Sequence, residues 1–141
     1  MSGAGRKVVI VPCSGIGKPH GSVAREAAYE VVEDLRPAQA DLVALSLLVL
    51  GDEEARAAVA AGPVVTIDGC KLACARKVVE GSGARVAREI DVLEASRRRR
   101  DLKPRGIAEL NEDGARLARL LAEEIAGAVD DLRRESGGED A

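Results

Sequence analysis

The sequence has almost no aromatic residues. Tyr29 is the only one, because Phe and Trp are both absent. Stacking platforms for nucleic-acid bases or sugar rings are therefore nearly excluded. The core must instead be built from Ala, Val, Leu and Ile, and 46% of the 141 residues are hydrophobic. A chain of this length suits one domain, which we expect to span residues 1–135, followed by a disordered acidic tail over residues 136–141.

A basic surplus and a long apolar stretch are also missing. The chain carries 21 Lys and Arg against 24 Asp and Glu, a net charge of −3, which argues against a general nucleic-acid binder. No stretch approaches the length of a membrane span. Residues 1–7 lack the apolar middle of a signal peptide. We therefore expect a cytoplasmic protein without a nucleic-acid or membrane partner, and we interpret the Arg-rich segment 97–105 as a solvated connection.

Short apolar runs alternate with helical patterns along the chain. Runs at 7–11, at 42–45 with an extension towards residue 50, at 64–67 and at 86–93 are typical of strands, the last one half-exposed at a sheet edge. Residues 24–35 show the three-to-four spacing of a helix, residues 112–134 carry a helical apolar stripe, and further helices are predicted between the later runs. This alternation predicts a three-layer α/β sandwich: a small, mostly parallel four-stranded sheet with helices on both faces, Rossmann-like or flavodoxin-like.

Capping and breaking residues indicate where the helices begin and end. The hydroxyl of Ser22 can cap the first helix, which Pro37 stops. Acidic residues at 52–54 favour the start of a second helix. A third helix is predicted over Lys71–Glu80, closed by Gly81.

The three cysteines, Cys13, Cys70 and Cys74, are the strongest candidates for a functional site. An odd count in a chain without a secretion signal favours metal binding or catalysis over disulfides. Cys13 follows the first predicted strand and Cys70 the third, and parallel strands end at the edge where ligands bind. On a helix that begins near Cys70, Cys70 and Cys74 would project from one face. The alternative is that all three are small buried apolar residues.

Two further residues could complete such a site. His20 is the only histidine and could be a fourth metal ligand, or a solvent-exposed loop residue. Asp68 closes the third strand and could orient the site, although we favour a role as a helix cap.

Gly15, Gly17 and Lys18 lie between a strand and a helix start, as in a phosphate cradle. Pro19 follows the lysine, so the loop is not a Walker A motif. The three residues are candidate cofactor-binding residues, and the alternative is that the glycines only let the backbone turn around Cys13.

Asp68–Lys77, with the sequence DGCKLACARK, resembles the signature of the DGC-domain family. Pro12–Gly15, with the sequence PCSG, resembles that family's first cysteine loop. The resemblance covers most of the chain up to about residue 95 and implies a small protein thought to bind zinc through four cysteines, with no settled reaction. Where relatives carry the fourth cysteine, this chain has Ser46, a poor zinc ligand. The resemblance therefore implies a fourth position that is empty or is filled by His20, water or a ligand.

The sequence thus predicts a metal-binding protein that holds zinc through Cys13, Cys70 and Cys74 at the carboxyl ends of the strands. The fourth position would be open to a small anionic or sulfur-containing ligand. One alternative is an enzyme that uses zinc-activated water or a Cys70 thiolate. Another is a redox protein with a three-thiolate iron–sulfur cluster. A homodimer also stays open, because the apolar stripe of the last helix could pack against a second copy.

Overall fold

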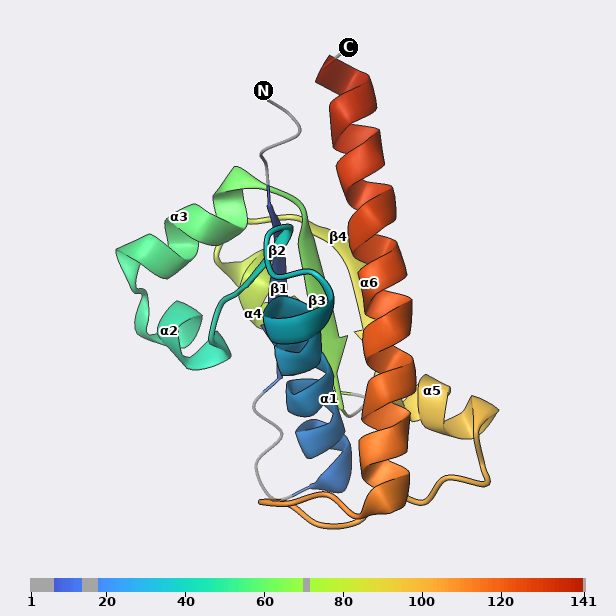
Figure 1. The fold of residues 1–141 in the computed structure, drawn as a ribbon. Coiled ribbons are helices and arrows are strands. Elements are labelled where there is room, and N and C mark those ends of the chain that lie inside the picture. The colour runs from blue at the N-terminus through green and yellow to red at the C-terminus, as the bar shows by residue number, and fades with distance from the viewer. Residues whose placement is uncertain (1–6, 14–17, 70–71, 141) are drawn as a thin grey trace.

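The computed structural model describes residues 7–13, 18–69 and 72–140, with side chains described as far as residue 135. Within these residues, four parallel strands form one sheet in the order β2-β1-β3-β4 (Figure 1). The strands are β1 (Val8–Pro12), β2 (Ala40–Leu42), β3 (Val64–Asp68) and β4 (Val86–Asp91). The predicted small parallel sheet is confirmed.

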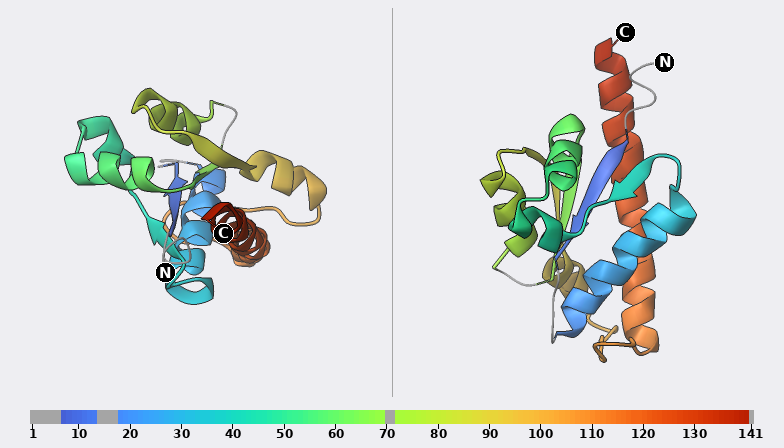
Figure 2. Two further views of the ribbon diagram at one scale, coloured as in Figure 1. Left: turned by 90° about the horizontal axis from the view of Figure 1, so that it is seen from above. Right: turned by 90° about the vertical axis from the view of Figure 1, so that its left-hand side faces the viewer.

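Helices cover both faces of this sheet. Helices α2, α3 and α4 lie on one face, and α1 and α6 pack together on the other, with α5 beside them (Figure 2). The helical elements of the described chain are α1 (Pro19–Glu30), the π-helical turn η2 (Val31–Leu35), α2 (Leu45–Leu50), α3 (Glu53–Ala61), α4 (Cys74–Gly81), α5 (Val92–Arg98) and α6 (Glu112–Asp140). This arrangement is the predicted three-layer α/β sandwich.

The centre of the sheet is the most buried part of the molecule. Every residue of β1 and of β3 is buried, because β-branched side chains point into both helical layers. Strand β4 is an edge strand with half-exposed and exposed side chains, as the sequence predicts. The two central strands therefore fix the positions at which the chain leaves β1 and β3 at their carboxyl ends.

Helix α6 closes the α1 face with an apolar stripe. Leu117, Leu121, Ile125, Val129 and Leu132 are all nearly or fully buried, as predicted from their spacing. The predicted helix over 112–134 is confirmed. The backbone of α6 as described also includes residues 136–140, for which a disordered tail stays a prediction. Among the described residues, no helix combines the length and the apolar character needed to cross a membrane.

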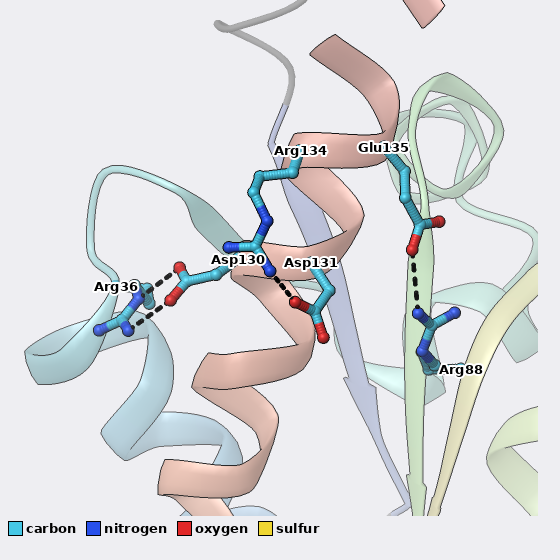
Figure 3. A network of polar contacts seen from close by, with 6 residues as sticks. All are labelled: Arg36, Arg88, Asp130, Asp131, Arg134 and Glu135. Atoms are coloured by element: carbon cyan, nitrogen blue, oxygen red, sulfur yellow. Dashed lines mark hydrogen bonds and ion pairs between the residues drawn. The ribbon is translucent and has the colours of Figure 1, made fainter. Parts of the chain in front are cut away.

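Ion pairs add polar attachments between α6 and the rest of the domain (Figure 3). The guanidinium of Arg36 donates two hydrogen bonds to the carboxylate of Asp130, both of 2.8 Å. Arg88 of β4 pairs with Glu135 at 3.2 Å. These pairs join α6 to the end of η2 and to the edge of the sheet.

The apolar run after Pro37 folds differently from the prediction. Only Ala40–Leu42 pairs with β1, and Leu45–Leu50 forms helix α2, which Gly51 ends in the left-handed region at φ 79°. A run of six mostly apolar residues fits a short helix as well as a buried strand, so periodicity alone could not separate them.

Two predicted boundaries are also wrong on the α1 face. Helix α1 begins at Pro19, whose fixed φ suits the first helical position, so Ser22 lies inside the helix. The Ser22 hydroxyl donates instead to the carbonyl of Ile107 at 2.6 Å. The start of the predicted connection after β4 is helical, because Asp91 caps α5 through its carboxylate.

Candidate functional site

The strand order places a topological switch point between β1 and β3. The chain leaves β1 for β2 on one side, whereas β3 lies on the other side of β1. Ligands of open α/β sheets bind beyond the carboxyl ends of the strands at such a point. Cys13 follows β1 there, and Asp68 and Gly69 stand at the end of β3. The topology therefore brings two of the predicted site segments to one edge.

Cys13 joins the two strand ends directly. Its backbone N–H donates to the carbonyl of Ile67 at 2.8 Å, and its Sγ accepts from the backbone N–H of Gly69 at 3.2 Å. The side chain is only 6% exposed and is not part of a disulfide. This hydrogen bond fixes the Cys13 sulfur against the backbone that leaves β3.

Asp68 caps helix α4 from a distance along the chain. Its Oδ1 accepts from the N–H of Ala75 at 2.8 Å and its Oδ2 from the N–H of Arg76 at 3.3 Å. The residue is buried, so these amides take the place of water around the carboxylate. The interpretation of Asp68 as a helix cap is confirmed.

Cys74 occupies the first position of α4, and its side chain is exposed. The predicted helix start near Lys71 is wrong, because Leu72 and Ala73 lie outside the helix and Ala73 has a left-handed backbone at φ 52°. The shared helical face predicted for Cys70 and Cys74 depended on that start, and Cys70 itself lies outside the described residues. The helix starts late because its cap is Asp68, at the end of β3, and not a residue beside it.

Gly69 packs directly against the first turn of α1. A Cβ at this position would lie 2.8 Å from the N of Gly21 and 2.9 Å from the C and O of His20. This contact brings the backbone of His20 to the same edge as Cys13. His20 lies half-buried in α1 and not in a loop. Burial lowers the pKa of its imidazole, which favours the neutral form that can bind a metal.

The remaining predicted residues are not all described. Gly15, Gly17 and Cys70 lie outside the described residues. Lys18 is the N-cap residue of α1, with an exposed side chain that makes no capping hydrogen bond. Within the described ranges, no three His, Cys, Asp or Glu side chains form a group that could hold a metal ion. A three-ligand site at this edge must draw on a residue outside those ranges, and Cys70 is the candidate that the sequence offers.

Helix α2 completes the surroundings of the site. It packs against α4, and Ser46 is exposed in its first turn. Large apolar side chains are exposed nearby on the chain, Leu47 and Leu50 in α2 and Leu72 before α4. A separate cavity of about 250 Å³ lies between α1, residues 107–110 and α6, and its lining includes none of Cys13, His20 and Cys74.

Sequence reasoning missed the role of Gly69 and the left-handed Ala73. An Asp-Gly pair after a strand signals a turn, but nothing local shows that the glycine meets the backbone of α1, some 50 residues earlier in the chain. Ala73 carries no signal, because a positive φ is uncommon for alanine.

Comparison with known proteins identifies the family. The profile of the DGC domain matches residues 9–114, a span that contains Cys13, the Asp-Gly-Cys segment and Cys74. Comparison with curated proteins gives no significant match, and comparison with solved structures gives none. The match covers most of the chain and every cysteine, so the resemblance noted in the sequence is confirmed. The chain belongs to the DGC-domain family.

Proposed function

We propose that this protein binds one zinc ion through Cys13, Cys70 and Cys74 at the carboxyl end of the sheet, in the cytoplasm. The hydrogen bond from the Gly69 amide to the Cys13 sulfur carries the proposal. It ties the first cysteine to the residue that immediately precedes Cys70 in the sequence. Cys13 at the sheet edge, Cys74 at the start of α4 and Cys70, which follows Gly69 in the sequence, would together supply the soft donor set that zinc prefers.

The fourth coordination position is the second part of the proposal. Ser46 lies in α2 and is exposed, and serine is a poor zinc ligand. His20 supports one solution, because its backbone meets Gly69 at this edge and burial lowers the pKa of its imidazole, which favours the neutral form. A small anionic or sulfur-containing ligand is the other, since zinc with three protein ligands keeps a site for exchange. Bound zinc would supply a Lewis acid there.

Metal analysis of anaerobically purified protein tests the first part. We expect about one zinc per chain and a colourless protein, as for a mononuclear thiolate site. Cys13→Ser, Cys70→Ser and Cys74→Ser should each lower zinc affinity by at least about tenfold. Less than about 0.1 zinc per chain would overturn the proposal. A brown protein with visible thiolate-to-iron absorption would replace zinc with an iron–sulfur cluster.

Two substitutions test the fourth position. Ser46→Cys should raise zinc affinity and slow zinc loss to a chelator if this position faces the metal, whereas His20→Ala should weaken binding if the imidazole is a ligand. Ser82→Cys is a matched control, because Ser82 follows the far end of α4. Equal effects of Ser46→Cys and Ser82→Cys would contradict a role for position 46.

A further inference from the structure

Residues 97–105 hold the strongest concentration of positive charge in the chain. They carry six basic side chains and one acidic one, in a chain whose net charge is −3. Arg98 pairs with Glu124 at 3.2 Å, and Arg99 pairs with Asp101 at 2.8 Å. Within the part of the chain that the structure describes, the other four basic side chains are exposed and form no hydrogen bond or ion pair: Arg97, Arg100, Lys103 and Arg105. Their charges are available to a partner.

The backbone of this segment is held in place, although its basic side chains are exposed. Leu102, in the middle of the segment, is buried in the core. The N–H of Lys103 donates to the carboxylate of Asp113 at 3.0 Å. The Asn111 side chain donates to the carbonyl of Lys103 and accepts from the N–H of Arg105, both at 3.0 Å. A segment that is already ordered loses less conformational entropy when a partner binds.

An apolar recess opens beside the segment, which runs from the last turn of α5 into the connection to α6 (Figure 1). The recess has a volume of about 240 Å³ and lies between the two helices. Its lining consists of four apolar residues and three charged ones: Ala95, Leu117, Leu120, Leu121, Arg98, Arg99 and Glu124. This volume is smaller than a typical small-molecule site, but it can receive an aliphatic side chain.

We propose that residues 97–105 and the adjacent recess form a docking surface for a protein segment that combines Asp or Glu with an aliphatic side chain. The arginines match carboxylates, because a guanidinium can donate two parallel hydrogen bonds to one carboxylate. The recess takes the aliphatic side chain, which its leucines remove from water. This docking surface contains none of the cysteines, so the inference is independent of the proposed zinc site.

Two other anionic partners match this docking surface less well. A nucleic acid would extend beyond the segment over a chain in which acidic residues outnumber basic ones, and the only aromatic residue, Tyr29, lies in α1. An anionic bilayer would meet Glu109 and Glu112, which are exposed just after the segment and repel it. A short acidic peptide can match the basic segment alone.

Binding of a labelled peptide of about ten residues, made of Glu and Leu, tests the proposal by fluorescence anisotropy. A matched peptide with Gln in place of Glu tests the charge, and one with Ala in place of Leu tests the recess. We expect the Glu-Leu peptide to bind at least about tenfold more tightly than the Gln peptide, and less tightly as salt rises. It should bind at least about threefold more tightly than the Ala peptide. No binding of the Glu-Leu peptide at about 1 mM would overturn the proposal.

Two triple variants show where the peptide binds. The first removes three charges of the docking surface, by Arg97→Gln, Arg100→Gln and Lys103→Gln. The control removes three exposed charges that also lack a side-chain partner in the described ranges, by Arg56→Gln, Lys77→Gln and Arg85→Gln. Both variants change the net charge equally. We expect the first to weaken peptide binding by about tenfold and the control by less than about twofold. Equal losses would overturn the proposal, because affinity would then follow the net charge alone.

Asn111→Ala tests the contribution of the ordered backbone. It removes the side chain that holds the segment and leaves every charge in place. We expect peptide binding to weaken by about three- to tenfold, because the segment must then be ordered on binding. Unchanged affinity would overturn this part of the proposal. Protection of the Arg105 amide from hydrogen exchange in the wild type tests the same point without a variant.

Two further probes separate the kinds of partner. These probes are a labelled oligouridylate of the same length as the peptide and vesicles that contain phosphatidylglycerol. We expect the wild type to bind both more weakly than the Glu-Leu peptide. Tighter binding of the oligouridylate or of the vesicles would overturn the acidic protein segment as the partner and assign the docking surface to a nucleic acid or to a membrane.

Discussion

Strands β3 and β4 both end in an aspartate that caps the next helix, but the two junctions differ in length. Asp91 accepts from amides two and three residues ahead, so β4 passes directly into α5. Asp68 accepts from amides seven and eight residues ahead, so the same chemistry encloses an intervening segment. The comparison teaches that a carboxylate at a strand end can cap a helix that begins several residues later. The additional length at β3–α4 carries the family's Asp-Gly-Cys segment.

Gly69→Ala should break the longer junction most severely. The added Cβ would meet backbone atoms of α1 at 2.8–2.9 Å, and backbone cannot rotate away as a side chain can. We expect a loss of about 2–3 kcal/mol in the free energy of unfolding, measured by urea denaturation. Gly81→Ala, at the other end of α4 and with nothing within 4 Å, is the control and should be neutral or stabilising by up to about 1 kcal/mol. Similar effects at both positions would contradict the close approach.

Asp68→Asn and Asp91→Asn compare the two caps themselves. Asn at position 68 leaves one buried amide without its acceptor, so we expect a loss of about 1–2 kcal/mol. Asn at position 91 keeps the oxygen that accepts from both Leu93 and Glu94 and should change stability by less than about 0.5 kcal/mol. Thermal unfolding of both zinc-free variants measures the difference. If Asp91→Asn proved the more destabilising change, the distinction between the junctions would be wrong.

Ala73→Gly should remove backbone strain from the β3–α4 junction and leave its hydrogen bonds in place. Glycine adopts the left-handed backbone of this position without the Cβ penalty, so we expect a gain of about 0.5–1 kcal/mol. Ala57→Gly, at an exposed position inside α3, should cost about 1 kcal/mol. Chemical denaturation measures the change in the free energy of unfolding for both Ala→Gly substitutions. A gain at position 73 together with a loss at position 57 would confirm strain at Ala73, and a loss at both positions would refute it.

The carboxylate of Asp130 forms an ion pair, whereas those of Asp68 and Asp91 cap helices. The hydrogen bonds from Arg36 lower the pKa of Asp130 below its usual value. Its stabilisation is therefore complete above the unfolded pKa and is lost as pH falls through the lowered one. Both side chains are partly exposed, so Asp130→Asn should cost about 0.3–1 kcal/mol at neutral pH.

The pH dependence of unfolding checks this smallest effect. The difference between wild type and Asp130→Asn should shrink below about pH 4, and it should also shrink in about 1 M salt, which screens the pair. A difference that stays constant from pH 7 to pH 3 would mean that packing, not the ion pair, is responsible.

Most of the fold could be predicted from the sequence, because the buried residues of its main strands and of its last helix follow simple patterns along the chain. The β-branched runs of β1 and β3 and the stripe of α6 could be identified without a structure. The run at 42–50 could not, because its apolar residues fit either a strand or a helix. The start of α4 could not, because its cap is Asp68 and the residues just before the helix carry no capping side chain.

The candidate site, too, could be predicted only in part. The meeting of Cys13 with the end of β3 follows from parallel strand order, and the hydrogen bond to Gly69 bears it out. The helix start near Lys71, on which the shared face of Cys70 and Cys74 depended, was wrong, and Cys70 lies outside the described residues. Topology was the better guide to which residues meet, and local spacing the poorer one.

Helix α6 has a consequence for where this domain can be cut. The family match ends at residue 114, only two residues after α6 begins, whereas the buried leucines of its stripe follow at 117, 121 and 132. A fragment trimmed to the matched span would expose the α1 face and lose the α6 part of the core. The stretch of sequence that matches the family is thus shorter than the stretch that packs into one apolar core.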